Sequence, residues 1–284
     1  MAISNIIPKE MSTLAGVIGY PVRHSKSPLL HNFWIRKYGL NAYYVPLEVS
    51  RLDFAEIVGT LPKMGFRGVN ITIPHKESAL EYCHGVSDRA ALIGAANTLR
   101  FGSDGLIFAD NTDGYGFTQN IRERVPTWRA SAGPALVIGA GGASRAIIHA
   151  LLEEGVAEVF LVNRTRDRAE FLRQEFGAKV IVHDWFALDA ILRDALTVVN
   201  TTVLGMAGKP DLDLNFELLR KEAVVNDLVY TPLDTRLLKD AAARGCHAVD
   251  GLGMLIHQAA ASFEIWFGIR PEVDIELRKY LLNS

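Results

Sequence analysis

The sequence predicts an α/β protein of two α/β domains. Short β-type apolar segments alternate with segments of helical spacing from about residue 14 and again from about residue 135, and such alternation is typical of parallel sheets covered by helices. The 284 residues exceed the length at which one hydrophobic core usually keeps growing. A glycine-rich loop also stands between a strand and a helix at the start of the second stretch, which is typical of a Rossmann-like domain.

The first domain is predicted to carry a mostly parallel sheet followed by a hairpin. Each strand has β-type composition, and each helix repeats its apolar residues at helical spacing. Gly102-Ser-Asp104 separates the last two strands and favours an antiparallel turn. The predicted order is a strand at 14–19, a helix from 28 to 38, a strand at 42–47, a helix at 52–61, a strand at 68–73, a short helix at 75–82, and hairpin strands at 97–101 and 105–109.

The second domain repeats the alternation after a polar stretch with Gly and Pro. Its predicted strands cover 135–138, 159–163, 180–183, 197–201, 224–227 and residues near 248, and its helices cover 144–154, 169–176 and 234–244. Residues 254–282 have a helical pattern with no strand after them, so we expect the last helices to return to the first domain. The predicted domains are therefore 1–112 with 252–284, and 113–251.

Composition favours a small-molecule ligand over a polymer or a membrane. Nearly half of the residues are apolar and the formal net charge is −2, whereas nucleic acids and anionic membranes attract a concentrated basic surface. Cys83 and Cys246 are the only cysteines and lack zinc-site spacing, so we expect no disulfide and no metal. The amino terminus has no signal-peptide pattern and the longest apolar region is interrupted by polar residues. We expect a cytoplasmic monomer or homodimer.

The glycine-rich loop is the first candidate binding site. Gly139 permits a tight turn, Gly141 and Gly142 let the backbone approach a pyrophosphate, and the following helix supplies free N–H groups. Ser144 stands where a third glycine is common, and a small residue there still allows close packing of the helix on the strand. The alternative is a glycine-rich turn that binds nothing.

The end of the next strand indicates which dinucleotide binds. An NAD site normally has an acidic residue there for the ribose hydroxyls, but Asn163 is followed by Arg164 and Thr165, with Arg168 one turn later. Guanidinium and hydroxyl groups suit a 2′-phosphate, so NADP is favoured. The alternative is a solvated helix start, although basic residues there oppose the helix dipole.

Polar residues at the end of another strand indicate the chemical site. Asn70 and Thr72 alternate on the predicted strand, so their side chains point to the same side. Lys76 follows just past the carboxyl end, where open α/β sheets bind ligands. Oxidising an alcohol requires a proton acceptor, and a lysine with a lowered pKa can serve.

Two further segments contain candidate site residues, each of which also has a purely structural interpretation. Asp113 is expected on a loop at the mouth between the domains, where it could hydrogen-bond the same hydroxyl, although Asp-Gly is also a common turn. Ser25 and Ser27 suit a carboxylate or a polyol, although a Ser-Lys-Ser-Pro segment before a helix is also a typical N-terminal cap.

Six segments in register together resemble the shikimate dehydrogenase family across almost the whole chain. They are Gly19-Tyr-Pro-Val-Arg-His-Ser-Lys-Ser-Pro28, Asn70-Ile-Thr-Ile-Pro-His-Lys76, Gly94-Ala-Ala-Asn-Thr98, Asn111-Thr-Asp-Gly-Tyr-Gly116, the glycine-rich loop Gly139 to Ala146 with Asn163-Arg-Thr165, and Gly251-Leu-Gly-Met-Leu-Ile-His-Gln258. Val203 departs from the family pattern, in which Ser is common at that position.

The resemblance implies roles for individual residues. Lys76 and Asp113 form the catalytic pair. The substrate residues are Ser25 and Ser27 for the carboxylate, Asn70, Thr72, Asn97 and Gln258 for the ring, and Tyr230. The cofactor residues are Gly139, Ala140, Gly141, Gly142, Ala143, Asn163, Arg164, Thr165, Arg168, Thr202, Leu228, Gly251 and Met254, the last near the nicotinamide.

The resemblance further implies NADP-dependent oxidation of shikimate to 3-dehydroshikimate in the chorismate pathway. Closure of the two domains on the ligand is expected to exclude water. Three alternatives remain: a quinate/shikimate dehydrogenase of broader specificity, a catalytically silent NADP-binding paralogue that recruits a partner, and a folate-type dehydrogenase of similar plan. Retention of both Lys76 and Asp113 argues against a silent protein, which needs no proton acceptor.

Overall fold

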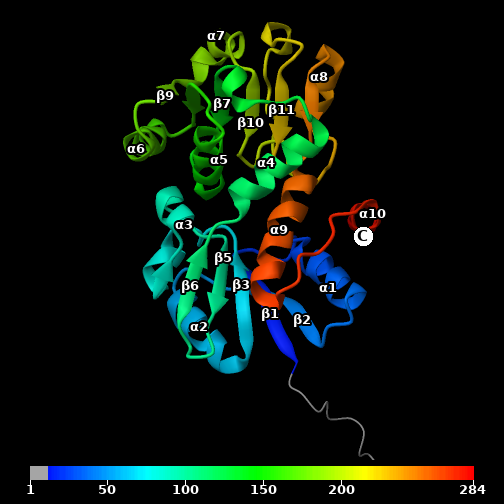
Figure 1. Cartoon of the computed structure of the whole chain (residues 1–284). Coiled ribbons are helices and arrows are strands. Elements are labelled where there is room, and N and C mark those ends of the chain that lie inside the picture. Colours follow the sequence, from blue (N-terminus) through cyan, green and yellow to red (C-terminus); the bar gives the residue numbers. More distant parts are fainter. Residues whose placement is uncertain (1–11) are drawn as a thin grey trace, which may run out of the picture. The chain divides into compact units, whose positions relative to one another are not determined.

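The computed structural model describes residues 12–284, and the amino-terminal segment for which no targeting signal is predicted lies outside the described residues. The chain divides into two compact units, which are the chain up to Thr112 together with Ala259–Ser284 (unit 1) and Asp113–Gln258 (unit 2). Each unit contains one six-stranded sheet with helices around it (Figure 1). The predicted class of two α/β domains is confirmed.

The sheet of unit 1 is parallel on one side and contains the predicted hairpin on the other. Its strand order is β2-β1-β3-β5-β6-β4. β1 runs parallel to both neighbours, and β5 and β6 are antiparallel. The strands are β1 (Thr13–Gly19), β2 (Ala42–Glu48), β3 (Phe66–Ile71), β4 (Gly85–Val86), β5 (Thr98–Phe101) and β6 (Ile107–Asp110), and the helices are α1 (Ser27–Lys37), α2 (Phe54–Thr60), α3 (Asp88–Ile93) and α10 (Ile275–Leu282).

The sheet of unit 2 is fully parallel, with the order β12-β11-β10-β7-β8-β9. This is the doubly wound order of dinucleotide-binding domains, in which ligands bind at the carboxyl ends of the strands beside the point where the order reverses. The strands are β7 (Ala135–Ile138), β8 (Val159–Val162), β9 (Val180–His183), β10 (Thr197–Asn200), β11 (Val224–Asp227) and β12 (His247–Val249), and the helices are α4 (Asp113–Arg124), α5 (Gly142–Glu153), α6 (Arg166–Phe176), α7 (Leu188–Leu192) and α8 (Arg236–Arg244).

The helix α9 (Gly251–Phe267) contributes residues to both units. Its part from Ala259 onward belongs to unit 1, where the indole Nε1 of Trp266 donates to the Leu99 carbonyl at 2.9 Å. The predicted return of the last helices to the first domain is confirmed.

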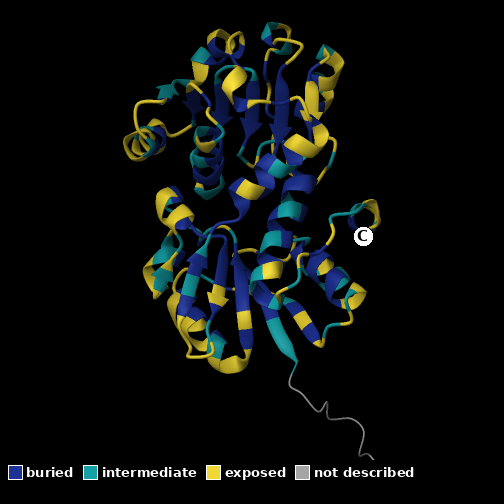
Figure 2. Cartoon of the chain, viewed as in Figure 1, coloured by how far each residue is buried: buried dark blue, intermediate teal, exposed yellow. Residues whose placement is uncertain are grey.

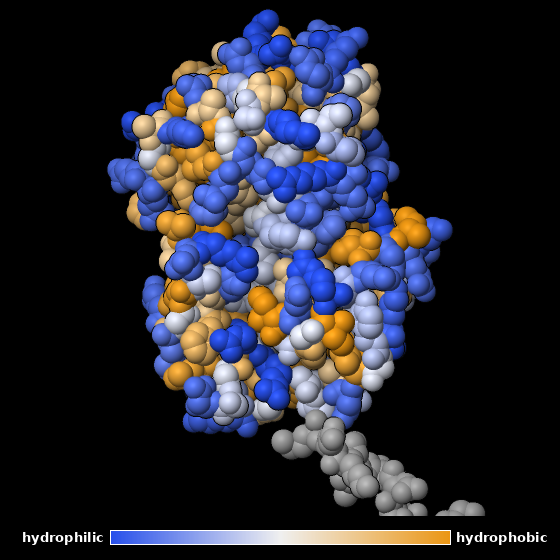
Figure 3. All heavy atoms as spheres, viewed as in Figure 1, coloured by the Kyte–Doolittle hydropathy of each residue, from blue (hydrophilic) through white to orange (hydrophobic). Residues whose placement is uncertain are grey.

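The four inner strands of the unit 2 sheet, β7, β8, β10 and β11, are buried throughout (Figure 2). All four residues of β7 and all four of β8 are buried, as expected for parallel strands covered by helices on both faces. α1 begins with Pro28 in its first turn, where a missing N–H costs no helical hydrogen bond. Hydrophobic and hydrophilic residues are interspersed on the face shown in Figure 3. Among residues 12–284, no helix has both the length and the apolar composition that a membrane span requires.

Three predictions near the expected substrate site are wrong. The strand predicted to reach residue 73 ends at Ile71, although the Thr72 amide still donates to the Ile18 carbonyl at 2.9 Å. The helix predicted at 75–82 is a single 3₁₀ segment, Ser78–Tyr82. Asp113 was predicted on a loop but is the first residue of α4.

The helix α4 was missed because its glycines resemble a turn. A Cβ on Gly114 would lie 3.2 Å from the carbonyl oxygen of Ala146, and one on Gly116 would lie 2.7 Å from that of Met254. These glycines allow α4 to pack closely against α5 and α9, and this packing outweighs their low helix propensity.

Candidate functional site

The predicted substrate residues of unit 1 gather at one edge of its sheet. β1 and β3 are parallel neighbours, so the loops that follow them, with Ser25 after β1 and Thr72 and Lys76 after β3, leave from the same edge. Asn97 directly precedes β5, whose Thr98 pairs with Asn70 of β3. The sheet therefore brings segments far apart in sequence to one place.

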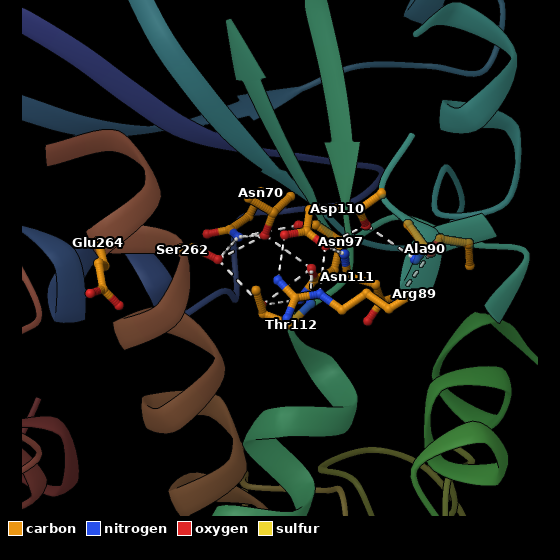
Figure 4. A network of polar contacts seen from close by, with 12 residues as sticks. Asn70, Arg89, Ala90, Asn97, Asp110, Asn111, Thr112, Ser262 and Glu264 are labelled. Carbon is orange, nitrogen blue, oxygen red and sulfur yellow. Dashed lines mark hydrogen bonds and ion pairs between the residues drawn. The ribbon is translucent and has the colours of Figure 1, made fainter. Parts of the chain in front are cut away.

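Asn70 is the centre of a buried polar network (Figure 4). Its Nδ2 donates to the carbonyl oxygen of Asn97 (3.2 Å), to Thr98 Oγ1 (3.1 Å) and to Ser262 Oγ (3.0 Å), and its Oδ1 accepts from the Tyr44 hydroxyl at 2.7 Å. Both ends of the amide are thus engaged within unit 1. Asn70 therefore holds the network together.

Asn97 connects this network to the end of unit 1. Its Oδ1 accepts from the Thr112 amide at 2.8 Å, and its Nδ2 donates to Thr112 Oγ1 at 2.9 Å. The amide of Ala96 donates to the carbonyl oxygen of Lys76 at 2.7 Å. The backbone of the predicted catalytic lysine is therefore fixed beside Asn97.

A second polar contact fixes the chain just before Thr112. The carboxylate of Asp110 accepts hydrogen bonds from Arg89 (Figure 4) and from the Ser87 hydroxyl. Burial by itself raises the pKa of Asp110, but these hydrogen bonds and the charge of Arg89 lower it below its ordinary value. Asn111 Nδ2 donates to the Ala95 carbonyl at 2.8 Å. The segment that leads into α4 is anchored at consecutive residues.

The serine pair lies beside the same network. Ser25 Oγ accepts from the Ser27 amide at 3.2 Å, while the N-cap position of α1 is Lys26, which makes no side-chain capping hydrogen bond in the described part of the chain. Burial raises the pKa of Tyr44 well above its ordinary value, and a hydrogen bond with Ser27 opposes this. The Tyr44 phenol is therefore a neutral donor between Ser27 and Asn70.

His75 supports the turn that leads to Lys76. Its Nε2 lies 2.8 Å from the Val49 carbonyl, and its ring stacks on Phe54 with centroids 4.5 Å apart. Burial lowers the pKa of His75, and the Val49 carbonyl opposes this. A neutral ring that donates from Nε2 fits this position.

In unit 2, the glycine-rich loop has the geometry of a phosphate-binding turn. Gly139 has φ +116°, and a Cβ there would lie 2.5 Å from Thr201 Oγ1. A Cβ on Gly141 would meet no described atom within 4 Å, so this backbone is open to a ligand. Ser144 does more than keep the packing close, because its Oγ accepts from the Gly141 amide at 3.1 Å and lies 2.6 Å from Thr201 Oγ1.

Donors for a 2′-phosphate follow β8. The guanidinium groups of Arg164 and Arg168 make no hydrogen bond or ion pair with residues 12–284. Thr165 is the N-cap residue of α6, yet among those residues its hydroxyl caps no amide. Two exposed cations at a helix start oppose the helix dipole, so they indicate an anionic ligand. Together with the open glycine loop, this donor set fits a dinucleotide that carries a 2′-phosphate.

The loops after β10 and β11 are braced from within. The Thr202 hydroxyl donates to Asn200 Oδ1 at 2.7 Å and accepts from the Leu204 amide at 3.0 Å. Asn200 Nδ2 in turn donates to the buried carboxylate of Asp227 at 2.9 Å. Burial raises the pKa of Asp227, while hydrogen bonds from Thr235, Val229 and Asn200 oppose this. The Thr202 hydroxyl is thus used by the loop itself.

The start of α9 packs closely on its surroundings in unit 2. A Cβ on Gly251 would lie 2.4 Å from the Leu228 carbonyl oxygen, so only glycine fits there. Met254 belongs to the hydrophobic core of unit 2. Gln258 is buried and faces Gly116, whose added Cβ would lie 2.8 Å from the Gln258 Cβ. Tyr230 is half-buried on the segment after β11.

Several residues of these networks were not predicted. Ser262 follows Gln258 by one helical turn, so helical spacing could have indicated it. Thr98 and Tyr44 carry no local signal, because their partners come from segments far away in the sequence. No group of metal-binding side chains occurs among residues 12–284.

Comparisons with known proteins identify related families and structures. Three family models match: the shikimate dehydrogenase substrate binding domain over residues 17–99, shikimate / quinate 5-dehydrogenase over residues 123–204, and the shikimate 5′-dehydrogenase C-terminal domain over residues 251–275. A protein of Cereibacter sphaeroides named shikimate dehydrogenase (NADP(+)) is 59% identical over 271 residues, covering 95% of this chain and 97% of that protein.

Two solved structures are similar over nearly their whole length. Shikimate 5-dehydrogenase from Thermus thermophilus, in complex with NADP(H) and shikimate, has a TM-score of 0.85 and 37% identity, covering 96% of this chain and 99% of that one. Quinate dehydrogenase from Corynebacterium glutamicum, in complex with NAD, has a TM-score of 0.89 and 31% identity, with coverage of 96% and 99%.

Proposed function

The chain belongs to the shikimate dehydrogenase family, and on that premise we propose that it catalyses the reversible oxidation of shikimate to 3-dehydroshikimate with NADP, in aromatic amino acid biosynthesis. The observation that carries this proposal is the 59% identity, over 95% of the chain, to a relative named for this activity and this cofactor. The guanidinium groups of Arg164 and Arg168, which have no partner among residues 12–284, lie beside the Thr165 hydroxyl and support NADP independently of that relative.

We propose that the two units have different binding roles. Unit 1 supplies most of the substrate residues, because its sheet edge gathers hydroxyl, amide and ammonium groups suited to a hydroxylated acid, while Tyr230 and Gln258 come from unit 2. Unit 2 binds the cofactor through the glycine loop and the end of β8. The proposed substrate residues are Ser25, Ser27, Asn70, Thr72, Asn97, Tyr230 and Gln258. The proposed cofactor residues are Gly139, Ala140, Gly141, Gly142, Ala143, Asn163, Arg164, Thr165, Arg168, Thr202, Leu228, Gly251 and Met254.

Proton transfer is assigned to Lys76 and Asp113. When bound, NADP supplies the nicotinamide ring that accepts the hydride. Lys76 Nζ takes the proton from the substrate hydroxyl, since a positioned amine can act as general base. Asp113 orients that hydroxyl and the ammonium group that results. The contacts of Ala96 with Lys76 and of Asn97 with Thr112 support this assignment, because they fix the neighbouring backbone on both sides.

The first test is the initial rate of NADPH formation with shikimate, with parallel reactions that use quinate or NAD. We expect a clear preference for shikimate with NADP. The similarity to a quinate dehydrogenase in complex with NAD makes quinate the second candidate. Preference for quinate or NAD would support that candidate, and turnover with neither acid would support a silent paralogue.

The second test concerns the lysine. Lys76→Ala should lose most turnover while the affinity for shikimate changes little. Lys63→Ala removes an exposed lysine of the same unit and serves as the matched control. Retained turnover in Lys76→Ala would remove this residue from the role of base.

We also propose a cytoplasmic monomer or homodimer with no nucleic-acid or membrane partner, which the near-neutral net charge of −2 supports. Light scattering after size-exclusion chromatography measures the oligomeric state directly. A higher oligomer, or co-purified nucleic acid, would contradict this.

A further inference from the structure

Three arginines lie at or just before the start of α6, and the contacts of one of them differ from those of the other two. The guanidinium groups of Arg164 and Arg168 make no hydrogen bond or ion pair with residues 12–284. Arg166 is instead held by two carboxylates, with its Nη1 2.6 Å from Asp184 Oδ1 and its Nη2 2.9 Å from Glu170 Oε1. Both Nη atoms of the Arg166 guanidinium group are therefore engaged in ion pairs.

Asp184 stands next to the segment proposed to bind the 2′-phosphate. β8 and β9 are parallel neighbours in which Val162 pairs with His183. The residues that follow, Asn163 and Asp184, therefore leave the sheet side by side at its carboxyl edge, about 5 Å apart in backbone spacing. Nothing in the sequence of the arginine segment indicates this carboxylate, because it is contributed by another strand.

A carboxylate at this place works against an NADP site. It is the kind of group that NAD sites use for the ribose hydroxyls, and it repels a phosphate that carries up to two negative charges. Arg166, the first residue of α6, forms an ion pair with Asp184 and so neutralises its charge.

We propose that Arg166 sets the preference for NADP by shielding Asp184 from the 2′-phosphate, and not by binding that phosphate, which is left to Arg164, Thr165 and Arg168. This inference rests on the proposed NADP function. It makes Arg166 and Asp184 a specificity-determining pair that acts through charge.

The size of the effect follows from Coulomb's law. Asp184 and Arg166 are both about half exposed, so the effective dielectric constant is close to that of water. An unshielded carboxylate about 7 Å from a doubly charged phosphate then weakens binding about three- to ten-fold, and added salt reduces the effect. NAD lacks this phosphate, so its binding should change less than about two-fold.

The experiment compares Arg166→Met, Asp184→Asn and the double variant with the wild type. Dissociation constants for NADPH and NADH are measured by cofactor fluorescence at low and at moderate salt, so the readout does not depend on turnover. Arg173→Met is the matched control, because Arg173 is on the same helix, is similarly exposed and also pairs with Glu170, but does not contact Asp184. Melting temperatures check that all variants fold.

The double variant decides the outcome. We expect Arg166→Met to weaken NADPH binding about three- to ten-fold, Asp184→Asn to bind NADPH at least as tightly as the wild type, and the double variant to return close to the wild type. A double variant as weak as Arg166→Met, or an equal loss in Arg173→Met, would overturn the shielding role. A wild type that binds NADH as tightly as NADPH would instead overturn the proposed cofactor.

Discussion

His31 should make unit 1 sensitive to acid. Its side chain is fully buried in an aromatic cluster, stacked on Tyr44 with centroids 4.1 Å apart and edge-on to Trp34. Neither ring nitrogen has a hydrogen-bond partner among the described residues. Burial lowers the pKa of His31 to about 3, and the Asn70 side chain opposes this to a smaller extent.

The sign and the size of the effect follow from linkage. The folded state holds His31 neutral, while the unfolded chain takes up a proton near the ordinary histidine pKa of about 6.5. The stabilising contribution is therefore complete above that pH and is lost progressively as the pH falls toward 3. At about pH 5, unfolding should be easier by about 2 kcal/mol from this residue alone.

The assay is urea unfolding at pH 7.5 and pH 5.0, followed by tryptophan fluorescence, for the wild type and His31→Phe. Phenylalanine keeps the aromatic packing at a cost below about 1.5 kcal/mol but does not titrate. We expect the variant to lose about 2 kcal/mol less than the wild type between the two pH values. His247→Phe, at an exposed position, controls for the loss of a histidine as such. Parallel losses in the wild type and His31→Phe would refute the reasoning.

Three other substitutions give measurable outcomes. Gly116→Ala should destabilise the protein by about 1–3 kcal/mol through overpacking. In the control Gly59→Ala, the new Cβ meets no described atom within 4 Å, so this variant should be stabilised by up to about 1 kcal/mol. Equal shifts of the melting temperature in both variants would contradict the close contact of α4 with α9. Because burial raises the pKa of Asp227, this group makes the fold less stable as the pH rises from its unfolded pKa through its folded pKa, and Asp227→Asn should flatten that part of the pH profile in urea unfolding. Ser144→Ala removes the acceptor of the Gly141 amide, so fluorescence titration should show NADPH binding weakened about three- to ten-fold, and unchanged binding would show that the loop holds its shape without this hydroxyl.

The central strands and the cofactor loop could be predicted because their signals are local. The four buried residues of β7 are followed directly by Gly139. An apolar strand that ends in a glycine-rich turn is typical of a dinucleotide-binding loop. The basic residues after β8 are likewise adjacent in the sequence.

The features that the sequence analysis missed depend on residues far away in the sequence. Gly114 and Gly116 disfavour a helix locally, and only contact with α5 and α9 makes that helix stable. The bond from Asn70 to Ser262 joins residues 192 positions apart. The pairing of Arg166 with Asp184 requires the register of β8 against β9. Such contacts form only when the chain has folded, so no local pattern could predict these pairings.

The hydrogen bond between Ser144 and Thr201 affects how tightly a ligand can bind. The hydrogen bond between the two hydroxyls ties the loop after β7 to the loop after β10. Fixing one flexible residue costs about 1–2 kcal/mol of conformational free energy, and this cost is met here during folding. A cofactor that arrives at this loop finds its amides already oriented, so more of its contact energy remains for affinity.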